Sequence, residues 1–103
     1  MLRTQIIFVA AAVALAGATV ARADGDLAAG KAKADACAGC HGANGEGVGS
    51  NPPLAGKSKE DFTKAIADYK SGTRKNAAMK MFSTKLTSQE VENLAAYYAS
   101  LKK

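Results

Sequence analysis

The stretch that decides the fold of this chain is CAGCHGANGEGVG, residues 37–49. The chain has two cysteines and one histidine in 103 residues, and all three lie within the first five positions of this stretch. Glycine then occupies every second or third position up to Gly49. Because the thiols and the imidazole of the whole chain are gathered in one place, we expect one bound group to use all three.

Cys37, Cys40 and His41 can serve several kinds of site. A thioredoxin-like dithiol needs its motif beside a βαβ unit, and no segment of this sequence has the pattern of a strand. A structural zinc ion needs four ligands, and the chain has only these three Cys and His residues. Covalent haem attachment, for which C-x-x-C-H is the signature, needs these three and no more. We therefore favour haem over zinc and over a simple disulfide.

The spacing of the motif has a physical reason in the haem interpretation. Two thiols three residues apart can add to the two vinyl groups on one side of a porphyrin. The imidazole of the next residue then lies where it can reach the iron.

Residues 1–23 have the layout of a secretory signal peptide. Arg3 gives a positive start, residues 6–15 are an unbroken apolar run, and Ala21-Arg22-Ala23 forms a small-x-small cleavage site. The run is shorter than the roughly 20 residues that span a bilayer, so an uncleaved anchor or a buried helix is the less favoured interpretation. Cleavage after Ala23 predicts a periplasmic protein, which agrees with haem attachment outside the cytoplasm.

Residues 24–103 form the expected mature domain. Taking 23 residues from 103 leaves 80, which is enough for one domain. A chain of this size buries only about 60% of its unfolded surface, and few aromatic residues are available for its core. They are Phe62, Tyr69, Phe82, Tyr97 and Tyr98. A large apolar cofactor would complete such a thin core.

The first half of the mature chain predicts a helix and a long connector. A short helix over residues 26–36 should lead into the cysteine motif. Residues 42–56 contain five glycines and two prolines, which is typical of a loop. We expect this connector to wrap around the bound group.

The second half predicts two further helices and no strand, so the domain is expected to be mostly α. Ser58 begins the first of them and Gly72 ends it. Residues 73–86 start as a polar loop. Thr87 and Glu90 form a capping box that opens the last helix. The apolar stripe of that helix is Val91, Leu94, Ala95, Tyr98 and Leu101.

Four motifs, taken in order, resemble those of a small bacterial class I cytochrome c. They are CAGCHG at 37–42, NPPLAG at 51–56, YKSGTR at 69–74 leading to Met79, and LAAYY at 94–98. The match covers essentially the whole mature chain and is similar to the c-553 type and to one half of the dihaem cytochrome c4. The resemblance implies an all-α fold of three to four helices around one covalently bound haem c, held by thioethers from Cys37 and Cys40.

The resemblance also implies the two axial ligands of the haem iron. His41 is expected to be the first, and bis-histidine ligation is impossible because the chain has no second histidine. Met79 and Met81 are the soft donors available. Met79 fits best, because in the family the ligand follows a G-x-R loop and precedes the last helix by several residues. Met81 stays the alternative, and the methionine that does not bind is expected to fill core space.

Two supporting contacts follow from the same resemblance. The carbonyl of Pro52 is expected to accept the Nδ1 proton of His41, although the tandem Pro52-Pro53 leaves open which proline carbonyl does so. Gly30 and Tyr97 are expected to meet where the first and last helices cross, because a glycine lets another helix approach closely.

Positive charge is concentrated in one part of the mature chain. Removing Arg3 and Arg22 lowers the net charge from +5 to +3, with −2 over residues 24–56 and +5 over residues 57–85. The basic segment is expected to surround the methionine side of the haem and to steer an acidic redox partner toward it. Some of these lysines can equally be solvated helix surface. Nucleic acid is not expected as a partner, because no interleaved aromatic platform accompanies the charge.

Together these features predict an electron carrier and not an enzyme. With both axial positions of the iron filled, no position is left for a small-molecule substrate, and no residue pair resembles a general acid and base. The protein is expected to pass single electrons between partner proteins and to touch a membrane only through them. The alternatives are the haem subunit of a larger dehydrogenase and an open-site haem sensor or peroxidase-like protein.

Overall fold

The computed structural model describes residues 25–102, and the expected signal peptide, residues 1–23, lies outside the described residues. Within that range the chain forms four α-helices and no strand: α1 (Leu27–His41), α2 (Lys59–Ser71), α3 (Ala77–Lys85) and α4 (Ser88–Ser100). A single isolated bridge joins Val48 and Asn51 in the connector. The prediction of an all-α fold with three to four helices is therefore confirmed.

Helix α1 is longer than predicted and carries the cysteine motif in its last turns. The Asp26 carboxylate caps its start by accepting hydrogen bonds from the backbone N–H groups of Ala28 and Ala29, at 2.9 and 3.2 Å. The helix runs on past residue 36 to His41, because nothing before Gly42 (φ 99°) breaks it. Cys37 and His41 are four residues apart in this helix, so they lie on the same face.

The predicted ends of α2 and α4 are confirmed by their hydrogen bonds. Ser58 Oγ accepts from the backbone N–H of Asp61 at 3.1 Å, and Gly72 ends α2 in the left-handed region at φ 88°. Both halves of the capping box at α4 are present. Thr87 Oγ1 accepts from the Glu90 N–H at 3.1 Å, and Glu90 Oε1 accepts from the Thr87 N–H at 2.9 Å.

Helix α3 lies where only a polar loop start was predicted. Asn76 caps it, since its side-chain oxygen accepts from the Met79 N–H at 2.9 Å. In a helix, two positions that are two residues apart point in different directions. Met79 accordingly packs against the core, whereas Met81 is 51% exposed.

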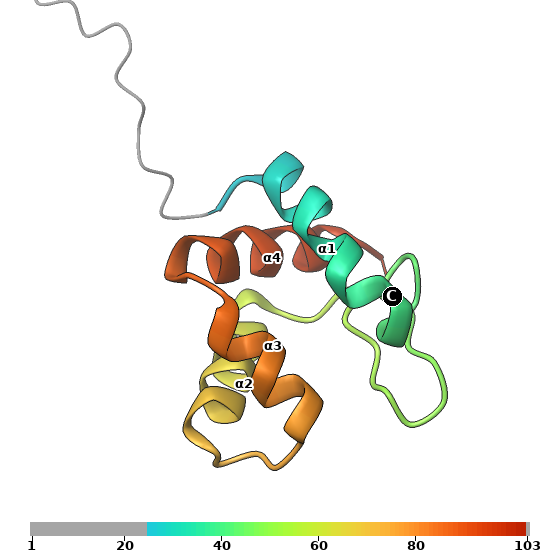
Figure 1. Ribbon diagram of the computed structural model, residues 1–103. Coiled ribbons are helices and arrows are strands. Elements are labelled where there is room, and N and C mark those ends of the chain that lie inside the picture. The colour runs from blue at the N-terminus through green and yellow to red at the C-terminus, as the bar shows by residue number, and fades with distance from the viewer. Residues whose placement is uncertain (1–24, 103) are drawn as a thin grey trace, which may run out of the picture.

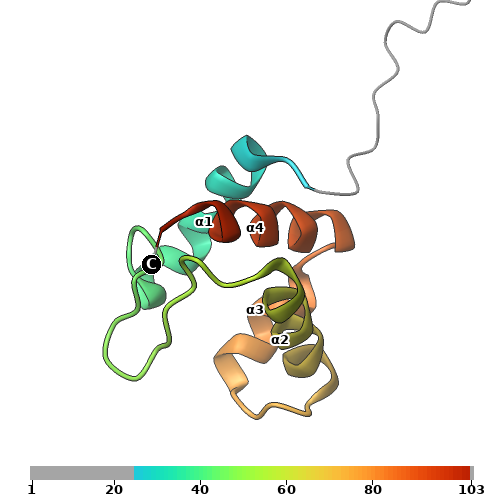
Figure 2. The ribbon, with the colours of Figure 1, turned by 180° about the vertical axis from the view of Figure 1, so that it is seen from behind.

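The four helices are arranged as two packed pairs (Figure 1). Helices α1 and α4 cross in the upper pair, and α2 and α3 form the lower one, with the connector running beside them; Figure 2 shows the same arrangement from behind. The crossing is close because of Gly30. A Cβ at that position would overlap the carbonyl of Asn93 and lie 2.8 Å from Tyr97 Cβ, so the expected meeting of Gly30 and Tyr97 is confirmed.

The core is centred on α4. Leu94, Ala95 and Tyr98 are each 1% exposed, and the ring of Tyr98 lies 5.7 Å from that of Phe62, centroid to centroid. Asn93 is buried as well and accepts the Asp26 backbone N–H on Oδ1 at 2.8 Å. None of the helices described for residues 25–102 has the length and apolar character needed to cross a membrane.

Candidate functional site

A large apolar cavity lies between the two helix pairs. It is partly open to solvent. Its walls include Cys37 and His41 from α1, Pro52 from the connector, and Met79 from α3. Four of the five residues predicted to bind or support a cofactor therefore line one cavity.

The His41 side chain is buried and held in one orientation. The residue is 7% exposed, and its Nδ1 lies 2.7 Å from the carbonyl oxygen of Pro52. A backbone carbonyl can only accept, so Nδ1 is the donor, and in the neutral ring Nε2 then keeps its lone pair. A neutral imidazole with a free Nε2 is the form that binds a metal ion.

The connector folds back on the end of α1 and thereby positions Pro52. Gly47 donates its N–H to the His41 carbonyl at 2.7 Å, and Asn51 donates its side-chain amide to the Cys40 carbonyl at 2.9 Å. Gly45 lies against Tyr98, because a Cβ there would come 2.7 Å from the ring. Short bonds to the motif itself therefore hold the connector against the end of α1.

The two cysteines differ in environment. Neither is in a disulfide. Cys37 is half-buried and lines the cavity, and burial raises the pKa of its thiol, an effect that the nearby Tyr98 hydroxyl and Lys33 partly offset. Cys40 is exposed and lies outside the cavity lining. No group of three or more His, Cys, Asp or Glu side chains within residues 25–102 is arranged to hold a metal ion.

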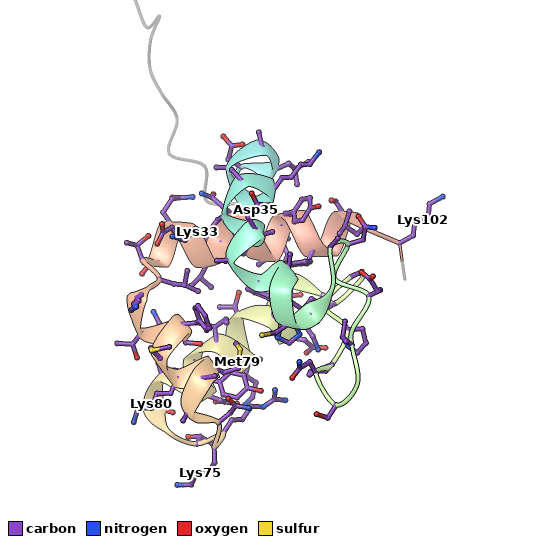
Figure 3. The ribbon with its side chains drawn as sticks, turned by 45° about the vertical axis from the view of Figure 1, so that its right-hand side comes forward. Lys33, Asp35, Lys75, Met79, Lys80 and Lys102 are labelled. Atoms are coloured by element: carbon purple, nitrogen blue, oxygen red, sulfur yellow. The ribbon has the colours of Figure 1, made fainter. Side chains whose placement is uncertain are left out.

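Met79 enters the cavity from the helix pair opposite α1. Figure 3 shows it in the middle of the molecule, between the two pairs. Its side chain is partly buried, whereas the exposed Met81 is not part of the cavity wall. The structure thus brings Met79, and not Met81, into the cavity that His41 lines.

Ser83 is a cavity residue that the sequence analysis missed. It is 0% exposed, and its Oγ has no hydrogen-bond partner among residues 25–102. A helical spacing of four residues from Met79 is the only sequence signal that could have drawn attention to it. The cavity wall also includes basic residues, among them Arg74. The guanidinium carbon of Arg74 lies 5.4 Å from the centroid of the Tyr69 ring.

The residues around the cavity fit a haem. A nitrogen with a free lone pair and a thioether sulfur lie on different walls, and these are the donor types that low-spin haem iron binds. The remaining wall is mostly apolar and includes Leu54, Phe62 and Ile66, as burial of a porphyrin ring requires.

Comparison with known proteins supports the same identification. The family model of cytochrome c matches residues 27–102. Cytochrome c4 of Pseudomonas aeruginosa is 43% identical over 84 residues, which cover 81% of this chain and 42% of that protein. Cytochrome c-554(547) of Halothiobacillus neapolitanus is 40% identical over 90 residues, covering 76% of this chain and 99% of that protein.

A solved structure with the same fold belongs to a larger protein. The thiosulfate dehydrogenase TsdBA of Marichromatium purpuratum superposes with a TM-score of 0.72 at 32% identity, over 88% of this chain and 22% of that one. The chain therefore spans less than half the length of the cytochrome c4 relative and a smaller part of the dehydrogenase. From its motif, its helical fold and these matches, the chain belongs to the cytochrome c family and binds haem c covalently.

Proposed function

We propose that this protein is a periplasmic carrier of single electrons whose haem is held by thioethers to Cys37 and Cys40 and ligated by His41 and Met79. The observation that carries the proposal is the pairing of His41 and Met79 on different walls of one cavity. The 2.7 Å contact between His41 Nδ1 and the Pro52 carbonyl supports it, since it leaves Nε2 available to the iron.

The residues around the haem determine how readily it accepts an electron. The haem supplies a one-electron couple at its iron. Met79 contributes a neutral thioether, which favours the ferrous state more than a second imidazole would and so raises the reduction potential. His41 is kept in one tautomer by Pro52, which fixes the direction of its bond to the metal. With both ligands in place no substrate can bind to the iron, so the protein acts as a carrier and not as an enzyme.

Export to the periplasm is part of the proposal. Residues 1–23 have the charge, apolar run and cleavage site of a signal peptide, with the expected cut after Ala23 and a mature domain over residues 24–103. N-terminal sequencing of the haem-loaded protein from a periplasmic extract tests this point. A start at Asp24 is expected, and an intact Met1 would contradict cleavage.

An optical titration tests the ligand assignment. Oxidised wild-type protein should show the weak far-red band that is typical of a methionine–iron bond. Met79→Ala should abolish this band and let cyanide or carbon monoxide bind rapidly. The matched control Met81→Ala removes an exposed methionine of the same helix and should keep the band. Loss of the band in the Met81 variant alone would reverse the assignment.

The partner is proposed to present an acidic surface. Lys75, in the loop before α3, and Lys80, on α3, project from the lower end of the molecule (Figure 3). Such exposed charges mainly raise the rate of encounter. Lys80→Glu should therefore slow reduction by the native partner at low salt, whereas Lys102→Glu, at the far end of the chain, should change it less. Equal effects of the two variants would remove this part of the proposal.

A second candidate is the haem subunit of a larger dehydrogenase, which the similarity to the TsdBA chain favours. In that case the haem site has the same chemistry, and the chain stays bound to the other subunits of the dehydrogenase. Gel filtration of an extract from the native host separates the two possibilities. A free carrier should elute at the volume expected for a protein of 80 residues. A subunit should elute earlier, together with its complex.

A further inference from the structure

The Ser83 hydroxyl is the buried side-chain polar atom that the described part of the chain leaves without a hydrogen bond. The residue lies near the C-terminal end of α3, is 0% exposed and forms part of the cavity wall. An unpaired buried hydroxyl lowers the stability of the folded protein. Such a group therefore calls for an explanation.

The usual local partner of a helical serine is not used here. Ser and Thr side chains inside helices commonly donate to the carbonyl four residues earlier. The neighbouring Thr84 does so, since its Oγ1 donates to the Lys80 carbonyl at 2.7 Å. The backbone of α3 therefore permits this bond, and Ser83 does not make it to the corresponding carbonyl of Met79. Its hydrogen is left available for a partner on the cavity side.

Met79 is the group on α3 that best matches this free donor. The two residues are four positions apart, so they lie on the same face of the helix, and both line the cavity. A thioether sulfur is a weak acceptor, and beside a mostly apolar wall a weak hydrogen bond gains strength. Lys57 and Arg74 also reach the cavity wall, but they are donors and cannot accept from a hydroxyl.

We propose that Ser83 is a positioning residue that donates its hydroxyl hydrogen to the Met79 sulfur when Met79 is bound to the haem iron. The inference rests on the proposed function, because it requires Met79 to be the ligand. The hydrogen bond withdraws electron density from the sulfur, which then stabilises the ferric iron less. Ser83 therefore raises the reduction potential of the protein.

The expected size follows from the strength of a typical hydrogen bond. The net contribution of one hydrogen bond corresponds to about a fivefold change in the equilibrium constant of the process that forms or strengthens it. Ser83→Ala should therefore lower the ratio of reduced to oxidised protein at a fixed potential by up to about fivefold. At 59 mV per tenfold change for one electron, this is a fall in midpoint potential of up to about 40 mV.

The test is a potentiometric titration of haem-loaded wild type, Ser83→Ala and Thr84→Ala. The control variant removes a hydroxyl from the adjacent position of the same helix, where the structure shows a different partner. The Ser83 variant should have the lower potential and a shifted Met79 methyl resonance in the proton NMR spectrum of the reduced protein. The Thr84 variant should match the wild type in both measurements.

Two further variants keep the test decisive if alanine disturbs packing. Ser83→Thr retains the hydroxyl, and Ser83→Val has nearly the same shape without it. Threonine should stay near the wild-type potential and valine should fall below it. Equal potentials for this pair, or an unchanged potential for Ser83→Ala, would overturn the inference. If the wild type shows the far-red band, such a result contradicts only the role of Ser83 and leaves Met79 as the ligand. If the wild type lacks the band, the proposed ligation by Met79 is itself contradicted.

Discussion

Replacing Gly30 with alanine should destabilise the protein, although alanine is the better helix former. On helix propensity alone the change favours the folded state by about 1 kcal/mol. A Cβ at position 30 would, however, overlap the Asn93 carbonyl and approach Tyr97 Cβ to 2.8 Å. The overlap is with backbone, so no side-chain rotation relieves it. Helix α1 must move away from α4.

The magnitude follows from what that movement disturbs. Overpacking at a close contact costs about 1–3 kcal/mol. The shift also stretches the 2.8 Å hydrogen bond from the Asp26 N–H to Asn93 Oδ1. We expect Gly30→Ala to lower the free energy of unfolding by about 1–3 kcal/mol. For a domain of this size each kcal/mol lowers Tm by roughly 4–8 °C.

Gly39 provides the matched control, because it lies in the same helix and a Cβ there would meet nothing within 4 Å. Gly39→Ala should leave stability unchanged or raise it by up to about 1 kcal/mol. The assay is thermal and denaturant unfolding of the haem-loaded proteins, followed by circular dichroism. A Gly30→Ala protein as stable as the wild type would refute the steric explanation of the helix crossing.

Further predictions concern the caps, the acid stability and the partner. Thr87→Ala removes the acceptor at the start of α4 and should cost about 1 kcal/mol in denaturant unfolding; a loss no larger than that of Ser88→Ala would contradict the role of the cap. Hydrogen bonding to the Thr87 backbone lowers the pKa of Glu90 from its ordinary 4.5. Because the folded-state pKa is the lower one, the stabilisation is present above pH 4.5 and is lost as pH falls through the folded value. Glu90→Gln should flatten that part of the profile of Tm against pH, and an unchanged profile would show that other carboxylates dominate. Reduction by the native partner should slow as salt is raised, and a rate independent of salt would exclude steering by the basic segment.

The sequence analysis predicted the haem motif and most helix ends because these are set by neighbouring residues. Ser58, Gly72 and the Thr87–Glu90 pair act within one turn of themselves, and the hydrogen bonds that they make are the predicted ones. Four residues of the predicted stripe of α4 are buried, since a single helix buries one face, whereas Leu101 lies just past the end of the helix and is partly buried. Cytochrome c membership followed from short motifs in a recognisable order.

Helix α3 and the length of α1 were not predicted, for a physical reason. Helix α3 has no fully buried apolar residue, since Ser83 is its buried position and its inner side faces a cavity and not a continuous protein core. Helix α1 continues through the cysteine motif to Gly42, and the connector then bonds back to its last turn through Gly47 and Asn51. Both outcomes depend on contacts between segments that are distant along the chain.

By itself, the amino-acid sequence determined the type of cofactor, the order of the helices and the pair of methionines from which a ligand could come. These properties depend on residue types and spacings over a few positions. Only the tertiary structure decided that Met79 faces the cavity while Met81 faces solvent, that Pro52 meets His41, and that Ser83 is buried without a partner. Each of these depends on how α1, α3 and the connector pack around a common space, and no local pattern encodes that packing.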